Sequence, residues 1–194
     1  MSSHPTVPWC RCAVAAVALA LPLVASAATV ACADSPPVKF ELSIDSGVMR
    51  EGKESRIEVR AHADGCVAVH RPWFLRDAGD YELRLGAQEW AALQTAVAPG
   101  DLGSLDRKSL AAQTSGLWKE TSTGALVFAD PDADVFTLQW HDGGKSHQLV
   151  ARNPLQAAAR QPNATEVNRV AAAIGALRAL ASRPGKRVGA EGRP

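Results

Sequence analysis

The chain has 194 residues, 46% of them hydrophobic, and its 21 basic and 20 acidic side chains leave a formal net charge of +1. A chain of this length is the size of one domain. A charge balance without a basic stripe along the body argues against a nucleic-acid-binding protein.

Residues 1–27 predict a secretory signal peptide. Arg11 is the only charged side chain among the first 33 residues, an uncharged apolar run covers 13–24, and Ala25-Ser26-Ala27 supplies the small residues that signal peptidases require. The apolar run is too short for a permanent membrane anchor, and no later stretch approaches about 20 apolar residues. We therefore expect a periplasmic or secreted protein without a transmembrane segment in its mature chain.

The position of cleavage decides the cysteine chemistry. Cleavage after Ala27 leaves Cys32 and Cys66 as two thiols in an oxidising compartment, which favours a disulfide that closes a loop of about 35 residues. Two alternatives stay open. Cleavage after Ala31, at a lipobox-like segment, would put a lipid anchor on Cys32 of a cell-envelope lipoprotein, and cleavage after Ala33 would leave Cys66 as a lone thiol.

The first half of the mature chain predicts strands followed by a helix. An extended segment at 28–37 leads into a strand in which Phe40, Leu42 and Ile44 alternate with polar residues. A hairpin follows at 56–70, then a strand with Tyr81, Leu83 and Leu85 on one face, and a helix over 87–97.

The turn of that hairpin sets which residues face the core. A three-residue turn, Ala63-Asp64-Gly65 with a left-handed Gly65, places four apolar side chains on one face: Ile57, Val59, Val67 and Val69. The opposite face then carries Arg60, His62, Cys66, Ala68 and His70.

The second half repeats the order of strands and helix. A long loop at 98–124, with a short helix capped by Ser104, precedes a strand at 126–128. A hairpin around Asp142-Gly143-Gly144 follows, and then a helix that Thr165 caps. Its apolar stripe contains Val167, Val170, Ile174 and Leu177. We expect one α+β domain over 38–181, an antiparallel sheet of about five to six strands with two helices on one face, and a flexible basic tail at 182–194.

No motif in the chain predicts a catalytic or metal centre. His62, Cys66 and His70 are spaced four residues apart, but on a hairpin His70 lies roughly 13 Å along the strand from the other two. Asp130, Asp132 and Asp134 begin like a calcium loop, yet Val135 and His141 stand where glycine and a bidentate acid are required. Nucleophile elbows, phosphate loops and zinc-binding helix motifs do not occur, so we expect no cofactor and regard an enzyme as unsupported.

The segment between Arg71 and Arg76 is the candidate binding site. Trp73, Phe74 and Leu75 are three large apolar side chains in a proline-containing loop, flanked by two arginines. Trp and Arg are the residue types that concentrate binding energy at interfaces. The alternative is that the three apolar residues pack beneath the loop as a satellite of the core.

Three stretches carry a resemblance to small exported bacterial α+β domains, including emfourin-like inhibitors of thermolysin-like metalloproteases. They are Asp64-Gly65-Cys66-Val67, the segment from Gly86 to Leu93, and the segment from Asp134 to Leu138. Ser46-Gly47-Val48-Met49 stand where the inhibitors have a glycine-rich segment, and no functional residue is carried over. The resemblance implies an inhibitor-like protein-binding role.

We therefore expect a non-catalytic exported domain that binds an unknown protein partner. The alternatives are a lipid-anchored envelope protein with a structural role and, less favoured, a hydrolase. The sequence leaves open the partner, the oligomeric state and the biological process.

Overall fold

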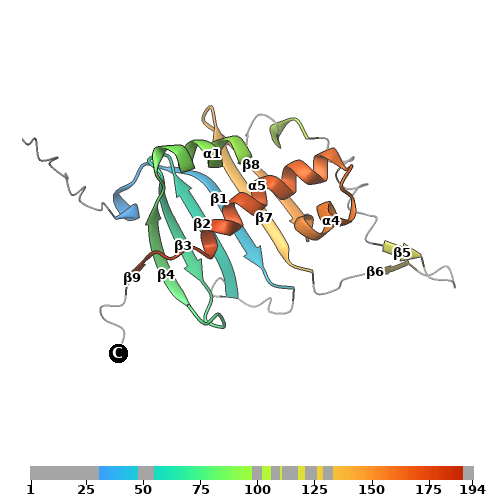
Figure 1. The fold of residues 1–194 in the computed structure, drawn as a ribbon, viewed down its shortest axis with the longest axis horizontal. Coiled ribbons are helices and arrows are strands. Elements are labelled where there is room, and N and C mark those ends of the chain that lie inside the picture. Colours follow the sequence, from blue (N-terminus) through green and yellow to red (C-terminus); the bar gives the residue numbers. More distant parts are fainter. Residues whose placement is uncertain are drawn as a thin grey trace, which may run out of the picture.

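The computed structural model describes residues 31–47, 55–97, 102–105, 110, 118–120, 126–128 and 133–189. Its main sheet has seven antiparallel strands in the order β8-β7-β1-β2-β3-β4-β9 (Figure 1). The strands are β1 (Val38–Asp45), β2 (Arg56–His62), β3 (Cys66–Arg71), β4 (Gly79–Arg84), β7 (Val135–Asp142), β8 (Lys145–Arg152) and β9 (Lys186–Val188). A separate two-stranded sheet pairs β5 (Trp118–Glu120) with β6 (Leu126–Phe128).

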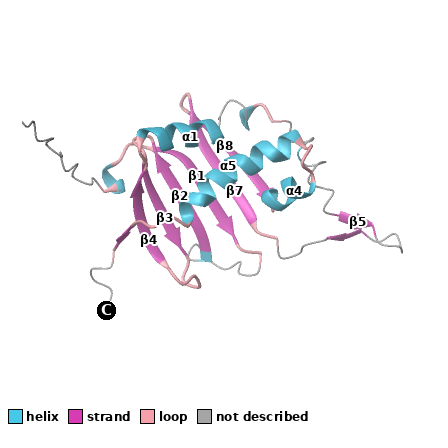
Figure 2. Ribbon diagram, in the orientation of Figure 1, coloured by secondary structure: helices cyan, strands magenta, loops and turns pink. Residues whose placement is uncertain are grey.

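Three α-helices cover one face of the main sheet (Figure 2). They are α1 (Ala87–Val97), α4 (Pro154–Arg160) and α5 (Thr165–Ala181), and a short 3-10 helix, η1 (Cys32–Asp34), precedes β1. The α+β class is thus confirmed, but the expected sheet of five to six strands and two helices is too small. In the part of the chain that the structure describes, the main sheet has seven strands, and three helices of seven or more residues accompany it.

The core lies between the helices and the inner face of the sheet. Helix α5 contacts β1, β2 and β3, and its predicted apolar stripe is fully buried. Helix α1 begins where the Glu89 carboxylate accepts a hydrogen bond from the Gly86 backbone N–H at 2.9 Å. Trp90 of this helix lies 5.7 Å from the ring of Phe40 on β1.

The predicted register of the β2–β3 hairpin is confirmed. Val59 pairs with Val69 and Ala61 with Val67, and Gly65 in the turn has a φ of 81°. An L-residue with a side chain rarely adopts this left-handed conformation, so glycine is required there. The inner face of the hairpin is therefore apolar, and its polar residues lie on the face opposite the helices.

One local prediction needs correction, and two others fall largely outside the described residues. Thr165 is the first residue of α5 rather than its cap, because Ala164 stands at the cap position and no side chain bonds there. Of the short helix predicted after Ser104, Leu110 is helical, and Ser104 lies in a turn after the helical residues Leu102 and Gly103, but 106–109 lie outside the described residues. Most of the loop at 98–124 lies outside the described residues.

Helix α4 and strand β9 were not expected. Helix α4 begins at Pro154 and buries Ala157 against α5. Strand β9 lies within the segment assigned to a flexible tail and pairs with β4. Neither has a strong hydrophobic period, and both depend on contacts with distant elements.

Candidate functional site

The loop between β3 and β4 carries the candidate binding residues and is held by two consecutive turns. The Leu75 backbone N–H donates to the Pro72 carbonyl oxygen at 3.0 Å, and the Ala78 N–H donates to the Leu75 oxygen at 3.1 Å. Pro72 is buried, and its ring fixes φ at the start of the first turn. These contacts give the loop a defined backbone conformation.

The two aromatic side chains of this loop lie at the surface. Trp73 is 67% exposed and Phe74 is 36% exposed. Their rings meet edge to face, with centroids 5.8 Å apart and planes at 86°. The alternative in which all three apolar residues pack beneath the loop is therefore wrong for Trp73, while Leu75 is half-buried.

Arg71 and Arg76 have different environments. Arg71 is only 9% exposed. Its Nε donates to the Ala181 carbonyl oxygen at 2.8 Å, its Nη2 donates to the Arg183 oxygen at 2.6 Å, and its guanidinium lies 4.2 Å from the Tyr81 ring centroid. Arg71 thus positions the loop from inside the protein, whereas Arg76 is exposed.

A second candidate is a hollow of about 280 Å³ on the sheet face opposite the helices. Charged side chains of three adjacent strands meet there: Glu58 and Arg60 of β2, His70 of β3, and Asp80 and Glu82 of β4. We call this group the charged hollow. The strand register brings the side chains together, because Glu58 lies opposite His70, which in turn lies opposite Asp80.

His70 and Asp80 form a hydrogen-bonded pair in the charged hollow. His70 Nδ1 lies 2.7 Å from Asp80 Oδ1, and His70 Nε2 is buried without a hydrogen-bond partner among the described residues. Such a pair can hold and transfer a proton. The lining of the charged hollow contains no serine, threonine or cysteine, and Ser43 lies two strands away from His70, about 10 Å. Among the described residues, no serine or threonine hydroxyl and no cysteine thiol therefore lines the hollow beside this pair.

Arg60 lies between two carboxylates of the same face. It pairs with Glu58 at 2.6 Å and with Glu41 at 3.2 Å. Partial burial alone would lower the pKa of Arg60, but the hydrogen bond to Glu41 and the charge of Glu58 outweigh it and raise the pKa. The arginine remains charged, and it neutralises only part of the acidic character of the face.

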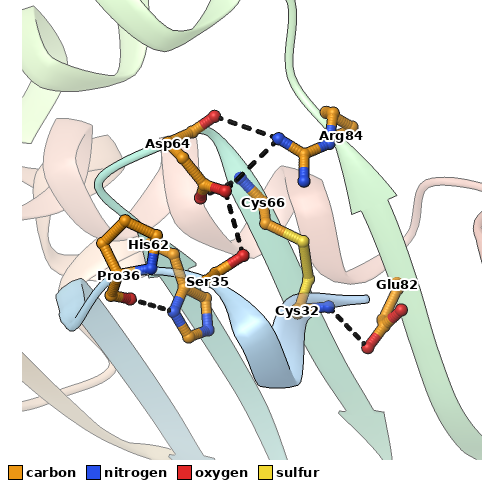
Figure 3. Close-up of polar contacts among 8 residues, drawn as sticks. All are labelled: Cys32, Ser35, Pro36, His62, Asp64, Cys66, Glu82 and Arg84. Carbon is orange, nitrogen blue, oxygen red and sulfur yellow. Dashed lines mark hydrogen bonds and ion pairs between the residues drawn. A yellow bond between two sulfur atoms is a disulfide. The ribbon is translucent and has the colours of Figure 1, made fainter. Parts of the chain in front are cut away.

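The N-terminal segment is fixed to this face by a disulfide between Cys32 and Cys66, as predicted (Figure 3). The Cys32 N–H donates to Glu82 Oε1 at 3.0 Å, and the Ser35 hydroxyl donates to Asp64 at 3.0 Å. The Cys32 sulfur in this bond is not available for a thioether to lipid. A lipid anchor and the observed disulfide are therefore mutually exclusive.

Asp64 is the polar centre of the hairpin turn (Figure 3). Partial burial alone would raise its pKa, but hydrogen bonds from the Cys66 backbone N–H and the Ser35 hydroxyl, together with the charge of Arg84, lower it. The carboxylate thus connects the turn, the N-terminal segment and β4.

The residues considered for metal binding have separate partners. Cys66 is in the disulfide, His62 Nδ1 lies 2.7 Å from the Pro36 carbonyl oxygen, and His70 pairs with Asp80. Within the part of the chain that the structure describes, no group of three or more His, Cys, Asp or Glu side chains is arranged to hold a metal ion. Asp134 accepts a hydrogen bond from the Gly47 N–H at 3.4 Å, whereas the other two acids of the calcium-like spacing, at 130 and 132, lie outside the described residues.

The charged hollow was not predicted, although part of it follows from the sequence. The three-residue turn at Gly65 places Glu58 opposite His70, as antiparallel pairing of the two strands requires. Asp80 and Glu82 enter only through the pairing of β3 with β4, whose register a long connecting loop does not determine.

No protein-family model matches this chain, and no curated protein is detectably similar to it in sequence. Among the described residues, no helix is both long and apolar enough to cross a membrane.

Proposed function

We propose that this protein is an exported, non-catalytic domain that binds a protein partner through the loop at 72–78. The observation that carries the proposal is the exposure of Trp73, at 67%, on a loop whose backbone is fixed at both ends. Large aromatic side chains supply much of the binding energy at protein interfaces when water is excluded from them.

The contacts that fix the backbone of the loop support a binding role. Arg71 connects the start of the loop to the carbonyl groups at the end of α5, and two turns fix the rest. A loop that is ordered before binding loses little conformational entropy in the complex, which raises affinity. The exposed Arg76 next to the aromatic pair adds a donor for carboxylate or carbonyl groups of a partner.

Export is supported by the signal-peptide pattern and by the disulfide. Disulfides persist in the periplasm and outside the cell, and they are rare in the reducing cytosol. We therefore place the partner in the same exported compartment.

The experiment compares wild-type protein with the double variant Trp73→Ala/Phe74→Ala and the matched control Val150→Ala. Val150 is 57% exposed on β8, far along the sheet from the loop, so the control removes exposed apolar surface away from the loop. Each protein is immobilised and presented with the exported protein fraction of its host, and any captured protein is purified and titrated by calorimetry. We expect at least tenfold weaker binding to the double variant and unchanged binding to Val150→Ala. Equal binding to all three proteins would refute the assignment to the loop.

The resemblance to emfourin-like inhibitors supplies a narrower form of the proposal, in which the partner is a thermolysin-like metalloprotease. Titrating the purified chain against thermolysin and measuring peptide hydrolysis tests it. Loss of protease activity in the presence of wild-type chain, but not of the double variant, is the expected result. Full activity at a large excess of the chain would reject the inhibitor form.

A further inference from the structure

The outer edge of β4 is covered by a short C-terminal strand. Strand β9 consists of Lys186, Arg187 and Val188, all three exposed, and it pairs antiparallel with β4. It follows α5 through the exposed Pro184 and the closely packed Gly185. Three exposed residues bury little apolar area, so the pairing of β9 contributes only weakly to stability.

The corner where β4 begins is shaped to accept the Arg187 side chain. The Arg187 Nη2 donates to the Ala78 carbonyl oxygen at 3.2 Å. Gly79 has a φ of 128°, and a Cβ atom there would lie 3.1 Å from Arg187 Nε. The absence of a side chain at Gly79 therefore leaves space for a guanidinium group.

The other two positions of β9 face the charged hollow. Lys186 lies opposite Glu82 and Val188 lies opposite Asp80, so their side chains share the face of these carboxylates. Val188 forms part of the wall of the hollow, together with Glu58 and His70. A long basic side chain in the place of Val188 would lie directly opposite Asp80 and could pair with its carboxylate.

We propose that the edge of β4 is a binding site for an extended basic segment of a partner protein, which adds to the sheet as a strand and displaces β9. The segment carries arginine at the position of Arg187 and basic residues at the positions of Lys186 and Val188. Strand β9 then occupies this site in the free protein, and its residues indicate the chemistry of the ligand. Backbone pairing with β4 supplies affinity, and the Ala78–Gly79 corner and the carboxylates of Asp80 and Glu82 supply specificity. This site shares Ala78 with the loop at 72–78 but does not use the Trp73 side chain, and the proposal does not depend on the proposed function.

The test measures the binding of a fluorescein-labelled peptide, Pro-Gly-Lys-Arg-Arg-Gly, by fluorescence anisotropy. It copies residues 184–189 with arginine in place of Val188. The protein is the full mature chain as wild type and as the variant Gly185→Val, in which the new Cβ would lie 2.8 Å from the Glu82 carbonyl oxygen and prevent β9 from docking. Arg187→Ala is a milder second variant that removes the bond to Ala78, and Val150→Ala, an exposed position on β8 at the opposite edge of the sheet, is the control.

We expect Gly185→Val and Arg187→Ala to bind the peptide at least tenfold more tightly than wild type and Val150→Ala. Adding Asp80→Asn and Glu82→Gln to Arg187→Ala should weaken binding at least tenfold, and a peptide with glutamate in place of its two arginines should not bind. Trp73→Ala should leave peptide binding unchanged, which separates this test from that of the loop.

Two results would overturn the proposal. One is equal peptide binding by wild type and by both variants that release β9. The other is a dimer of the wild type, measured by light scattering, that Gly185→Val abolishes, because a second copy of the chain would then be the occupant of the edge.

Discussion

Arg71 at the end of β3 donates from Nε to the carbonyl oxygen of Ala181, 2.8 Å away at the last residue of α5. The last carbonyl groups of a helix have no partner within the helix, and a buried cation is a favourable partner for them. This contact joins the helical layer to the sheet at the point where the loop at 72–78 leaves β3. It also explains how an arginine flanking the proposed binding loop acts as a structural residue.

Replacing Arg71 should therefore destabilise the protein. We expect Arg71→Met, which keeps the apolar contact with Tyr81 but leaves two carbonyl groups without their donor, to lower the free energy of unfolding by about 2–4 kcal/mol. Urea denaturation followed by fluorescence measures the change. The exposed Arg76→Met should change stability by less than about 0.5 kcal/mol, and a similar small change at Arg71 would contradict its structural role.

Removing the disulfide should have an effect set by the length of the loop that it closes. The bonded residues are 34 apart, so the double variant Cys32→Ala/Cys66→Ala should lose about 3–4 kcal/mol of stability in the chain-entropy model. Wild type with its disulfide reduced should unfold at the same urea concentration as the variant. Intact mass before and after reduction should differ by two hydrogen atoms, and an acylated Cys32 would instead favour the lipoprotein form.

Gly65 should tolerate substitution poorly for two separable reasons. Gly65→Ala forces an alanine into a left-handed conformation, at about 1–2 kcal/mol, and also places a Cβ 3.1 Å from the Leu85 carbonyl oxygen. Gly144 has a similar φ, of 78°, but open space around its Cβ position. Gly144→Ala should therefore show the conformational cost alone, and a larger loss for Gly65→Ala in thermal or urea unfolding would measure the contribution of the close approach.

Asp64 should make stability depend on pH in the acid range. Its pKa is lowered in the folded protein, so its contribution is present above the pKa of an unfolded aspartate, about 3.9, and is lost as the pH falls through the depressed folded value. The difference in unfolding free energy between wild type and Asp64→Asn should be constant near pH 7, begin to shrink near about pH 4, and disappear only below the depressed pKa of the folded protein. A difference that grows toward low pH would have the wrong sign. Asp77→Asn, an exposed acid outside this network, is the control.

The proposed sites differ in how far the sequence predicts them. Trp73 and Phe74 were found because large apolar residues in a proline-containing loop are unusual, and the structure exposes Trp73. His70 and Asp80 were not recognised as a pair, since ten residues and a loop of undetermined geometry separate them along the chain.

The amino-acid sequence by itself determined the local elements of this protein: the alternating strands, the apolar stripe of α5, the left-handed turn at Gly65 and the pairing of two cysteines. Each of these follows from periodicity, from a conformation that only certain residues adopt, or from the count of thiols. The tertiary structure alone decided that Arg71 is buried, that His70 meets Asp80 and that β9 covers the edge of β4. These contacts depend on which distant segments become neighbours in the sheet, and no periodicity within one segment specifies its neighbour.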